Sequence, residues 1–319
     1  MKLLITGVHG FVGSNLVNAL SKDYEIYGLD IISPQKAGVI KTYTWDDILT
    51  SQEHINDFDA IIHLAGKAHD TKNKTNADIY FQVNTELTKK IYEFFLQSSA
   101  KKFVFFSSVK AAADVVEGDI LTENITPKPV GPYGESKIAA EKYIQERILS
   151  DNHEKLTYIL RPCMIHGPGN KGNLNLLYNI VSKGIPWPLG AFENRRTFTS
   201  IDNLCYIINN LLIKDVKTGI YNMNDDEAIS TNELIEIICT ALGKKAHIWK
   251  TPKGLVYLLA RIGDIIHLPL NTERLKKLTE NYIASNKKIK DELGISKMPV
   301  RAKDGLNKTI LSFSKEKNQ

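Results

Sequence analysis

The chain has 319 residues, of which 43% are hydrophobic and 24% are charged, and its formal net charge at pH 7 is +5. This is the composition of a globular protein that can bury a full core, and the length predicts two domains or one large domain with a lobe. Lysine and arginine are scattered, with their main excess between Lys287 and Lys317. Such a tail is typical of a solvated face, so no nucleic-acid partner is expected.

Cysteine usage and hydropathy predict the compartment. The three cysteines are Cys163, Cys205 and Cys239. They are far apart, odd in number and without the short spacings that hold a metal, which predicts free thiols, no metal and a reducing compartment. The opening MKLLITG is too short for the apolar region of a signal peptide. The longest apolar stretch, residues 255–270, is interrupted by Arg261 and Asp264, so no membrane span is expected. A cytoplasmic protein is the resulting prediction.

Runs with strand character alternate with amphipathic stretches of helical length through the first half of the chain. The strands are expected at residues 3–6, 25–30, 60–64, 103–107 and 157–160. The helices are expected at residues 12–20, 84–97 and 133–149. Alternation of this kind predicts right-handed crossovers and an α/β fold with a doubly wound parallel sheet of the Rossmann type.

The pattern changes after Arg161. Residues 161–173 are rich in glycine and proline, and residues 183–190 contain two prolines that exclude a regular helix or a central strand. Helices are expected again at 231–242 and 272–278. We predict a Rossmann domain over residues 1–165, to which the chain returns at about 196–224, and a smaller, mostly helical C-terminal substrate lobe over residues 166–319.

A glycine-rich loop joins the first predicted strand to the first predicted helix. Gly7, Gly10 and Gly13 are spaced three apart, which permits a tight turn and a close backbone approach. The N-terminus of the following helix offers unpaired N–H groups to a pyrophosphate. The spacing therefore favours dinucleotide binding, although a turn packed tightly for its own sake has the same glycines.

The second predicted strand ends at Asp30, about 20 residues beyond the glycine loop. A carboxylate there accepts hydrogen bonds from the adenosine ribose and would repel a 2′-phosphate. Ile31 and Ile32 follow it rather than an arginine, which favours NAD over NADP. The alternative is an aspartate that caps its own loop.

Small or polar residues also follow the strands that end near positions 64 and 107. Ala65 and Gly66 would let the backbone pass close to a ligand, whereas His63 is expected to be a hydrogen-bonded strand histidine. Ser107 and Ser108 stand where the next strand meets its loop. Ligands bind outside the carboxyl ends of the strands in such sheets, so these features converge on one dinucleotide site.

Tyr133 and Lys137 lie one turn apart on the same stripe of a predicted helix as Ala140, Ile144 and Ile148. An ammonium group about 5 Å from a phenol, at an effective dielectric near 20, would stabilise the phenolate by about 3 kcal/mol, or roughly two pKa units. Proton transfer would then become feasible near neutrality. A solvated helix face is the alternative, and the apolar neighbours count against it.

Together these features resemble the extended short-chain dehydrogenase/reductase family, in its nucleotide-sugar epimerase/dehydratase branch, and the UDP-glucose 4-epimerases in particular. The resemblance covers residues 1 to about 225 and rests on GVHGFVG, Asp30, HLAG, Asn84 within VNTE, FFSS and YGESK.

The family resemblance implies a role for each matching residue. Tyr133 would be the catalytic acid and base, Lys137 would hold the nicotinamide ribose, and Ser108 would hydrogen-bond the reacting sugar oxygen. Cofactor contacts are implied for Gly7, Gly10, Phe11, Val12, Gly13, Asp30, Asp47, Ile48, Leu64, Ala65, Gly66, Asn84 and Lys137. Arg195 would bind the substrate diphosphate, and Asn173 is a further implied substrate contact.

Three departures from relatives in the family narrow the chemistry. The dehydratases carry an acidic pair where this chain has Val109 and Lys110, and a cysteine used by another relative beside its serine is absent. Met164 replaces an asparagine that contacts the sugar in UDP-galactose 4-epimerases. The prediction is NAD-dependent 4-epimerisation of a nucleotide-activated hexose or N-acetylhexosamine through a transient 4-keto sugar.

Two alternatives stay open at this point. One is a reductase of nucleotide-linked 4-keto-6-deoxy sugars that uses the same residues in surface polysaccharide synthesis, and the other is a non-catalytic NAD(P)-binding sensor. The expected partner is the nucleotide sugar, and the resemblance also implies a homodimer formed through helices of the Rossmann half.

Overall fold

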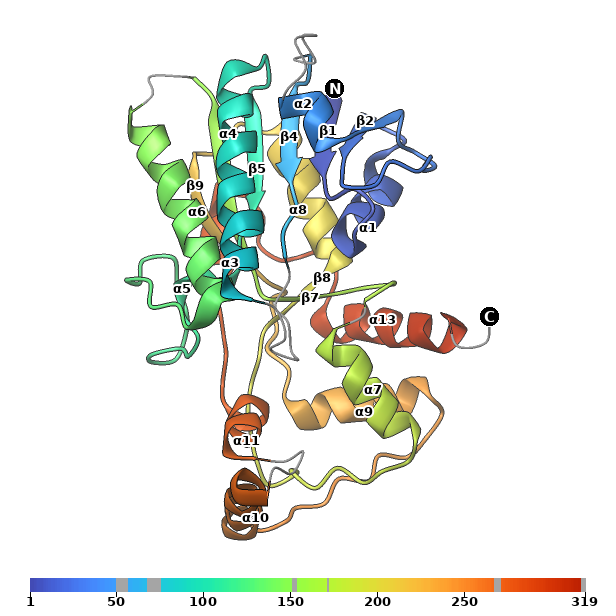
Figure 1. Ribbon diagram of the computed structural model, residues 1–319. Helices are drawn as coiled ribbons and strands as arrows, with labels where there is room; N and C mark the ends of the chain where they lie inside the picture. Colours follow the sequence, from blue (N-terminus) through green and yellow to red (C-terminus); the bar gives the residue numbers. More distant parts are fainter. Residues whose placement is uncertain (50–56, 68–75, 151–153, 171, 267–270, 317–319) are drawn as a thin grey trace.

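The computed structural model describes residues 1–49, 57–67, 76–150, 154–170, 172–266 and 271–316. Seven parallel strands form the main sheet in the order β3-β2-β1-β4-β5-β6-β9 (Figure 1). Their bounds are β1 Lys2–Thr6, β2 Glu25–Leu29, β3 Lys41–Tyr43, β4 Ala60–His63, β5 Lys102–Phe106, β6 Leu156–Pro162 and β9 Gly219–Met223. The predicted α/β fold with a doubly wound parallel sheet is confirmed. The strand order reverses between β1 and β4, so the crevice that binds ligands in such folds lies there.

Helices cover both faces of this sheet. On one face lie α1 (Phe11–Leu20) and α8 (Ile201–Ile213), whose side chains share a core with β1 and β6. On the other face lie α4 (Leu87–Gln97) and α6 (Gly131–Ser150), which pack with β5 (Figure 1). The central strands are buried on both faces, as expected for a parallel sheet between two helical layers.

The helix expected to begin at Asn84 begins earlier. Helix α3 (Ala77–Tyr80) runs into a π-helical turn, η1 (Phe81–Glu86), and then into α4. The predicted start was wrong because the first two turns present Asp78, Gln82 and Glu86 to solvent and interrupt the apolar periodicity. π-Helical turns are rare and often mark functional positions.

The C-terminal lobe has its own core. Helices α7 (Asn173–Ser182), α9 (Thr231–Ala241), α10 (Lys253–Ile266), α11 (Thr272–Thr279) and α13 (Ala302–Glu316) surround it. Two short helices, α2 (Trp45–Leu49) and α5 (Val109–Ala112), follow β3 and β5, and α12 (Lys287–Leu293) packs on β9. No helix in the described ranges combines the length and the apolarity needed to cross a bilayer.

The chain comes back to the main sheet through α8 and β9, which lie within the range expected at about 196–224. Strand β8 (Phe198–Ser200), at the start of that range, pairs with β7 (Met164–His166) in a separate two-stranded sheet. The edge position beside β6 is occupied by β9, and the short β8 segment therefore serves the lobe.

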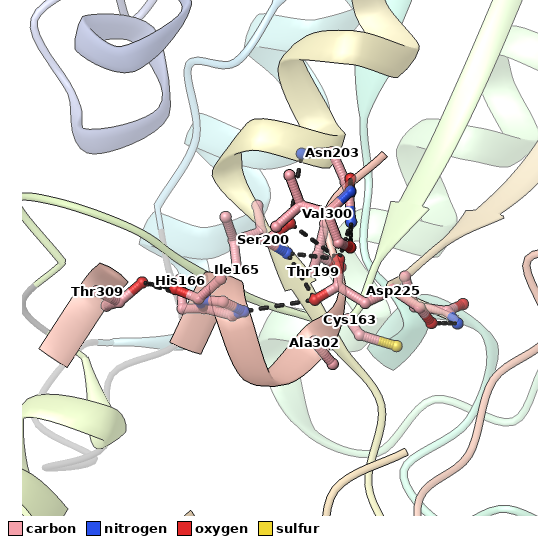
Figure 2. A network of polar contacts seen from close by, with 12 residues as sticks. Cys163, Ile165, His166, Thr199, Ser200, Asn203, Asp225, Val300, Ala302 and Thr309 are labelled. Carbon is pink, nitrogen blue, oxygen red and sulfur yellow. Dashed lines mark hydrogen bonds and ion pairs between the residues drawn. The ribbon is translucent and has the colours of Figure 1, made fainter. Parts of the chain in front are cut away.

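A buried polar network ties the lobe to the main sheet (Figure 2). Asp225, two residues after the end of β9, accepts hydrogen bonds from the backbone N–H and hydroxyl of Ser200 and from the Asn203 amide at 2.7 Å. His166 lies between Asp225, at 3.5 Å, and the Thr309 hydroxyl, at 2.9 Å. Residues of β7, β8 and α8 thus meet at one carboxylate, and α13 joins the network through His166.

The basic C-terminal segment is more than the expected solvated face. Helix α13 buries Leu306 and Ile310 in the core of the lobe. Its lysines pair with acidic residues of other helices, since Lys308 contacts Asp202 at 2.8 Å. The charge excess in the sequence did not indicate this packing, because the apolar positions are spaced between the lysines.

A buried ion pair lies beneath the carboxyl end of β5 and β6. Arg161 and Glu141 are 1% and 0% exposed, and two of their polar atoms are 2.5 Å apart. Arg161→Ala would leave a buried unpaired carboxylate, so we expect the free energy of unfolding to fall by about 3 to 5 kcal/mol. Urea unfolding would measure the loss.

A matched control for this pair lies on the surface. Arg147 pairs with Glu93, and both side chains are about one-third exposed. Arg147→Ala is expected to cost about 1 kcal/mol or less, because solvent screens an exposed pair. Equal losses in the two variants would contradict a structural role for the buried pair.

Candidate active site

The glycine loop after β1 lies closely against the loop after β4. Gly7 has a φ of +69°, and a Cβ placed on it would be 3.0 Å from the Ala65 nitrogen. A Cβ on Gly13 would lie 2.4 Å from the Gly7 oxygen. The N–H groups of Phe11 and Val12 are in the first turn of α1, where the helix supplies no carbonyl partner. This cradle fits a dinucleotide pyrophosphate, which needs a close backbone approach and unpaired donors.

The close contact at Gly13 carries a prediction. Gly13→Ala would push the glycine loop away from α1, and overpacking of this size costs about 1 to 3 kcal/mol. We expect NAD affinity to fall at least about tenfold and the melting temperature to drop, measured by calorimetry. Gly254→Ala in α10 is the control, because a Cβ there meets no atom within 4 Å. Unchanged NAD affinity in the Gly13 variant would contradict the cradle.

Asp30 follows β2 and is held beside the glycine loop. One carboxylate oxygen accepts the His9 N–H at 3.0 Å, and the other accepts the Ile31 N–H at 2.8 Å. The carboxylate therefore does cap loop amides, as the alternative interpretation held. A carboxylate has about four lone-pair sites, so it can also accept ribose hydroxyls.

The two residues implied near the adenine lie on α2, after β3. The Asp47 carboxylate is exposed and accepts the Thr44 N–H at 2.7 Å, and hydrogen bonds to Thr44 lower its pKa. Ile48 is 7% exposed and belongs to the core with Tyr43 and Phe58. The Ile48 side chain thus points into the core of the protein. Adenine contact by either residue stays a prediction.

Asn84, Gly66 and Lys137 converge below the switch point of the sheet. Asn84 lies in the π-helical turn and is fully buried; its amide oxygen accepts the Lys67 N–H at 2.8 Å and its amide nitrogen donates to Ser136. A Cβ on Gly66 would be 2.9 Å from the Asn84 oxygen and 3.1 Å from the Lys137 Nζ. The loop after β4, the π-helical turn and α6 are therefore in direct contact, and only glycine fits between them.

Hydrogen bonds to the Thr6 hydroxyl hold the loop after β4 in place. The N–H groups of Leu64 and Ala65 both donate to the Thr6 hydroxyl, at 3.1 and 2.9 Å. His63 hydrogen-bonds the hydroxyls of Thr6 and Thr88, and burial lowers its pKa to about 3. The prediction of a hydrogen-bonded strand histidine is confirmed, and His63 is neutral at physiological pH.

The two serines after β5 differ in their partners. Ser107 donates to the buried Glu141 carboxylate and faces away from the crevice. The Ser108 hydroxyl accepts the Lys110 N–H at 3.2 Å, which starts α5, and its side chain hydrogen-bonds Tyr133. Ser108 is therefore the serine that lies beside the tyrosine.

Tyr133 and Lys137 sit at the start of α6. The Tyr133 ring is half-buried and packs edge-on against Tyr80, with centroids 6.2 Å apart. The Lys137 side chain is buried, and its ammonium group donates to the Phe106 oxygen at 2.8 Å and lies 5.1 Å from the Phe105 ring centroid. A lysine that is 5% exposed excludes the alternative of a solvated helix face.

The expected lowering of the Tyr133 pKa is wrong for the protein chain by itself. Burial raises the Tyr133 pKa, and the hydrogen bond with Ser108 lowers it by less. Lys137 is directed to the Phe106 carbonyl, and burial lowers its own pKa to about 8. Helix spacing indicates that the lysine is close to the tyrosine, but it does not reveal the desolvation of the two groups.

The two implied substrate contacts lie in the lobe. Arg195 is exposed, and its guanidinium donates to the Ala228 oxygen at 2.8 Å. Asn173 is the first residue of α7, and its side chain is outside the described part of the structure. Both substrate roles therefore stay predictions.

Sequence reasoning overlooked the neighbouring Arg196. Its side chain is directed inward, with Nη2 3.3 Å from Glu280 and a buried Nε that has no partner among the described residues. Asp114 is near enough for its charge to act on Arg196, and the Tyr282 hydroxyl donates to the Ala113 oxygen at the end of α5. Adjacent residues of an extended segment point in opposite directions, and this alternation was the available signal.

Comparisons with known proteins agree with this geometry. Residues 3–223 match the family model of the NAD dependent epimerase/dehydratase family. The chain is 29% identical to a UDP-glucose 4-epimerase of Vibrio cholerae, over 99% of this chain and 97% of that protein. It is 27% identical to an N-acetyl-alpha-D-glucosaminyl-diphospho-ditrans,octacis-undecaprenol 4-epimerase of Escherichia coli O157:H7, over 83% and 79% of the two chains.

A solved structure of similar shape is the UDP-glucuronic acid 4-epimerase of Bacillus cereus in complex with NAD, with a TM-score of 0.74, 22% identity and coverage of 99% of both chains. The prediction of NAD as cofactor is confirmed at the level of the family. The matched residues include the glycine cradle, Asp30, Ser108, Tyr133 and Lys137. The chain belongs to the NAD dependent epimerase/dehydratase family.

Proposed function

We propose that this protein epimerises carbon 4 of a nucleotide-activated hexose or N-acetylhexosamine. The observation that carries the proposal is that Tyr133 lies beside Ser108 and one helical turn before the buried Lys137, on the same edge of the sheet as the glycine loop and Asp30. A sensor that only binds NAD would not need a tyrosine and a buried lysine at these positions. The family and the named relatives support the same reaction class.

The residues of the chain would act on the proton of the 4-hydroxyl. Ser108 hydrogen-bonds both the tyrosine and the sugar oxygen, which fixes that oxygen within reach of the Tyr133 phenol. Tyr133 takes the hydroxyl proton when the 4-keto sugar forms and returns it when the other epimer is made. Lys137 stabilises the phenolate between these steps. When bound, NAD would supply the hydride chemistry at carbon 4, in both directions, while the residues of the chain handle the proton.

Elimination of water is not supported by the residues beside Ser108. Val109 is 4% exposed and packs in a small core with Tyr282, and Lys110 pairs with Asp114 at 2.8 Å. A dehydratase needs a free acid and base at this position to remove the proton and the hydroxyl group. At this position the chain has Lys110, whose ammonium group already pairs with Asp114.

A specific observation favours a second substrate class. The Escherichia coli relative acts on a sugar diphosphate attached to undecaprenol, and this chain aligns with 79% of it. We therefore infer that a sugar diphosphate on a polyprenol is the second candidate substrate for the same 4-epimerisation. The diphosphate in either substrate would need cations, for which Arg195 and Arg196 are the candidates.

One experiment distinguishes an epimerase from a reductase and from a sensor. The purified protein is incubated with NAD and, separately, UDP-glucose, UDP-N-acetylglucosamine, the lipid-linked N-acetylglucosamine diphosphate and a UDP-linked 4-keto-6-deoxy sugar. Anomeric proton signals that interconvert without added reductant support the epimerase. Stoichiometric NADH consumption with the keto sugar alone would assign the protein as a reductase, and NAD binding without turnover would assign it as a sensor.

Two further features belong to this proposal. The three cysteines are free, which fits an enzyme of the reducing cytoplasm. A homodimer through α4 and α6, which contact one another on one face of the sheet, remains a prediction that light scattering tests.

A further inference from the structure

Helix α10 has two apolar faces. The inner face packs on the lobe through Val256, Ala260 and Gly263, which are buried. The outer face, which we name the α10 stripe, consists of Leu255, Leu258, Leu259, Ile262 and Ile266. These five positions have the spacing of one helix face, and each side chain is between 40% and 60% exposed.

The inner face already anchors the helix. Besides the three buried residues, Tyr257 packs edge-on against Phe192 at 5.8 Å, and the Lys253 ammonium lies 5.6 Å from the same ring. The α10 stripe belongs to none of the apolar clusters that the described residues form. A row of large, half-exposed apolar side chains marks an interaction surface.

Exposed basic residues outnumber acidic ones in the segment that carries α10 and α11. Residues 249–279 contain two acidic side chains, Asp264 and Glu273. Asp264 accepts the Thr272 N–H, and Glu273 pairs with Lys277 at 2.6 Å. The six basic residues of the segment are Lys250, Lys253, Arg261, Arg274, Lys276 and Lys277, and all are exposed.

We propose that the α10 stripe and these basic residues dock the protein on an anionic lipid bilayer, with α10 lying in the plane of the interface. An amphipathic helix with Leu and Ile on one face and Lys or Arg beside it binds in this way, through apolar burial and attraction to anionic headgroups. A second copy of the chain is disfavoured as the partner, because two such faces would bring basic segments together.

The position of α10 in the molecule permits this docking. Figure 1 shows α10 at the end of the lobe opposite to the main sheet. A bilayer contact there leaves both helical layers of the sheet in water. The proposal does not rest on the identity of the sugar substrate, because binding to vesicles is measured without substrate.

Cosedimentation with vesicles tests the proposal. The full-length protein is expected to bind vesicles of phosphatidylcholine with phosphatidylglycerol, and to bind vesicles of phosphatidylcholine alone more weakly. Leu258→Glu with Ile266→Glu is expected to lower the partition coefficient at least about tenfold, since two apolar side chains no longer enter the interface. Lys250→Gln with Lys276→Gln should lower it about fivefold per residue, and added salt should do the same.

The matched control places the same two charges elsewhere on the surface. Leu149→Glu with Ile213→Glu changes exposed residues of α6 and α8 in the Rossmann half and is expected to bind vesicles as the wild type does. Equal binding by both glutamate variants would overturn the proposal, as would a wild-type protein that fails to bind anionic vesicles. A dimer that depends on Leu258 and forms without lipid would assign the α10 stripe to a second copy. Turnover by the α10 variant, measured with a water-soluble substrate, shows that it is folded.

Discussion

Tyr133→Phe is expected to lower kcat by about 10³-fold while NAD still binds. The variant keeps the ring that packs on Tyr80 and loses only the hydroxyl that hydrogen-bonds Ser108. Removal of a positioned acid and base typically costs a factor of about 10² to 10⁴. NMR of the anomeric protons measures turnover, and calorimetry measures NAD affinity.

Tyr143→Phe is the matched control for this experiment. Tyr143 is on the same helix, and its hydroxyl donates to Glu93 at 2.6 Å, away from the crevice. We expect full turnover from this variant. Full turnover from Tyr133→Phe as well would show that the phenol takes no part in proton transfer, whereas joint loss of turnover and NAD binding would indicate a structural role.

Lys137→Met is expected to change the pH dependence as well as the rate. Burial lowers the pKa of Lys137 to about 8, and burial raises the Tyr133 pKa above its usual value near 10. The active form has a Tyr133 phenolate and a Lys137 ammonium group. The fully protonated pair must therefore lose one proton to reach this form. In the wild type kcat/KM should therefore rise with pH up to about 8, where the pair loses its first proton.

Without the lysine, the first proton must come from Tyr133 itself. The rising limb of kcat/KM should then move above about pH 10, and activity at pH 7 should fall about a hundredfold or more. NAD is kept saturating, because Lys137 is also expected to contact the nicotinamide ribose. Lys142→Met, an exposed lysine of the same helix, should leave the profile unchanged. A variant profile that superimposes on that of the wild type would rule out the proposed lysine role.

The sequence predicted the elements that position the cofactor with small errors in their bounds. The five expected strands are present, because a strand buried on both faces is a short continuous apolar run, which its length and the flanking turn residues reveal in the sequence. Strand β3 was missed because it has only three residues, Lys41–Tyr43. The π-helical turn at Asn84 was missed because nothing in local periodicity distinguishes i+5 hydrogen bonding from an ordinary helix.

The properties of the site that depend on burial, and on residues distant in the chain, were harder to predict. Spacing alone placed Lys137 one turn after Tyr133, and the structure buries that lysine. The direction of the Tyr133 pKa shift was wrong because the helix spacing does not reveal desolvation or the Phe106 carbonyl that binds the lysine. Likewise, the inward direction of Arg196 depends on its pairing with Glu280, which is 84 residues away in the chain.

The interleaving of lobe and sheet limits how the protein can be divided. The chain leaves the sheet after β6, returns for α8 and β9, packs α12 against β9 and ends in the lobe with α13. No single cut would release an intact substrate module, and grafting this lobe onto another nucleotide-binding half would require exchanging several segments at once. Fusion of a complete lobe from another protein therefore cannot change the substrate of this fold. New sugar specificity has to arise by substitutions within the existing loops and helices.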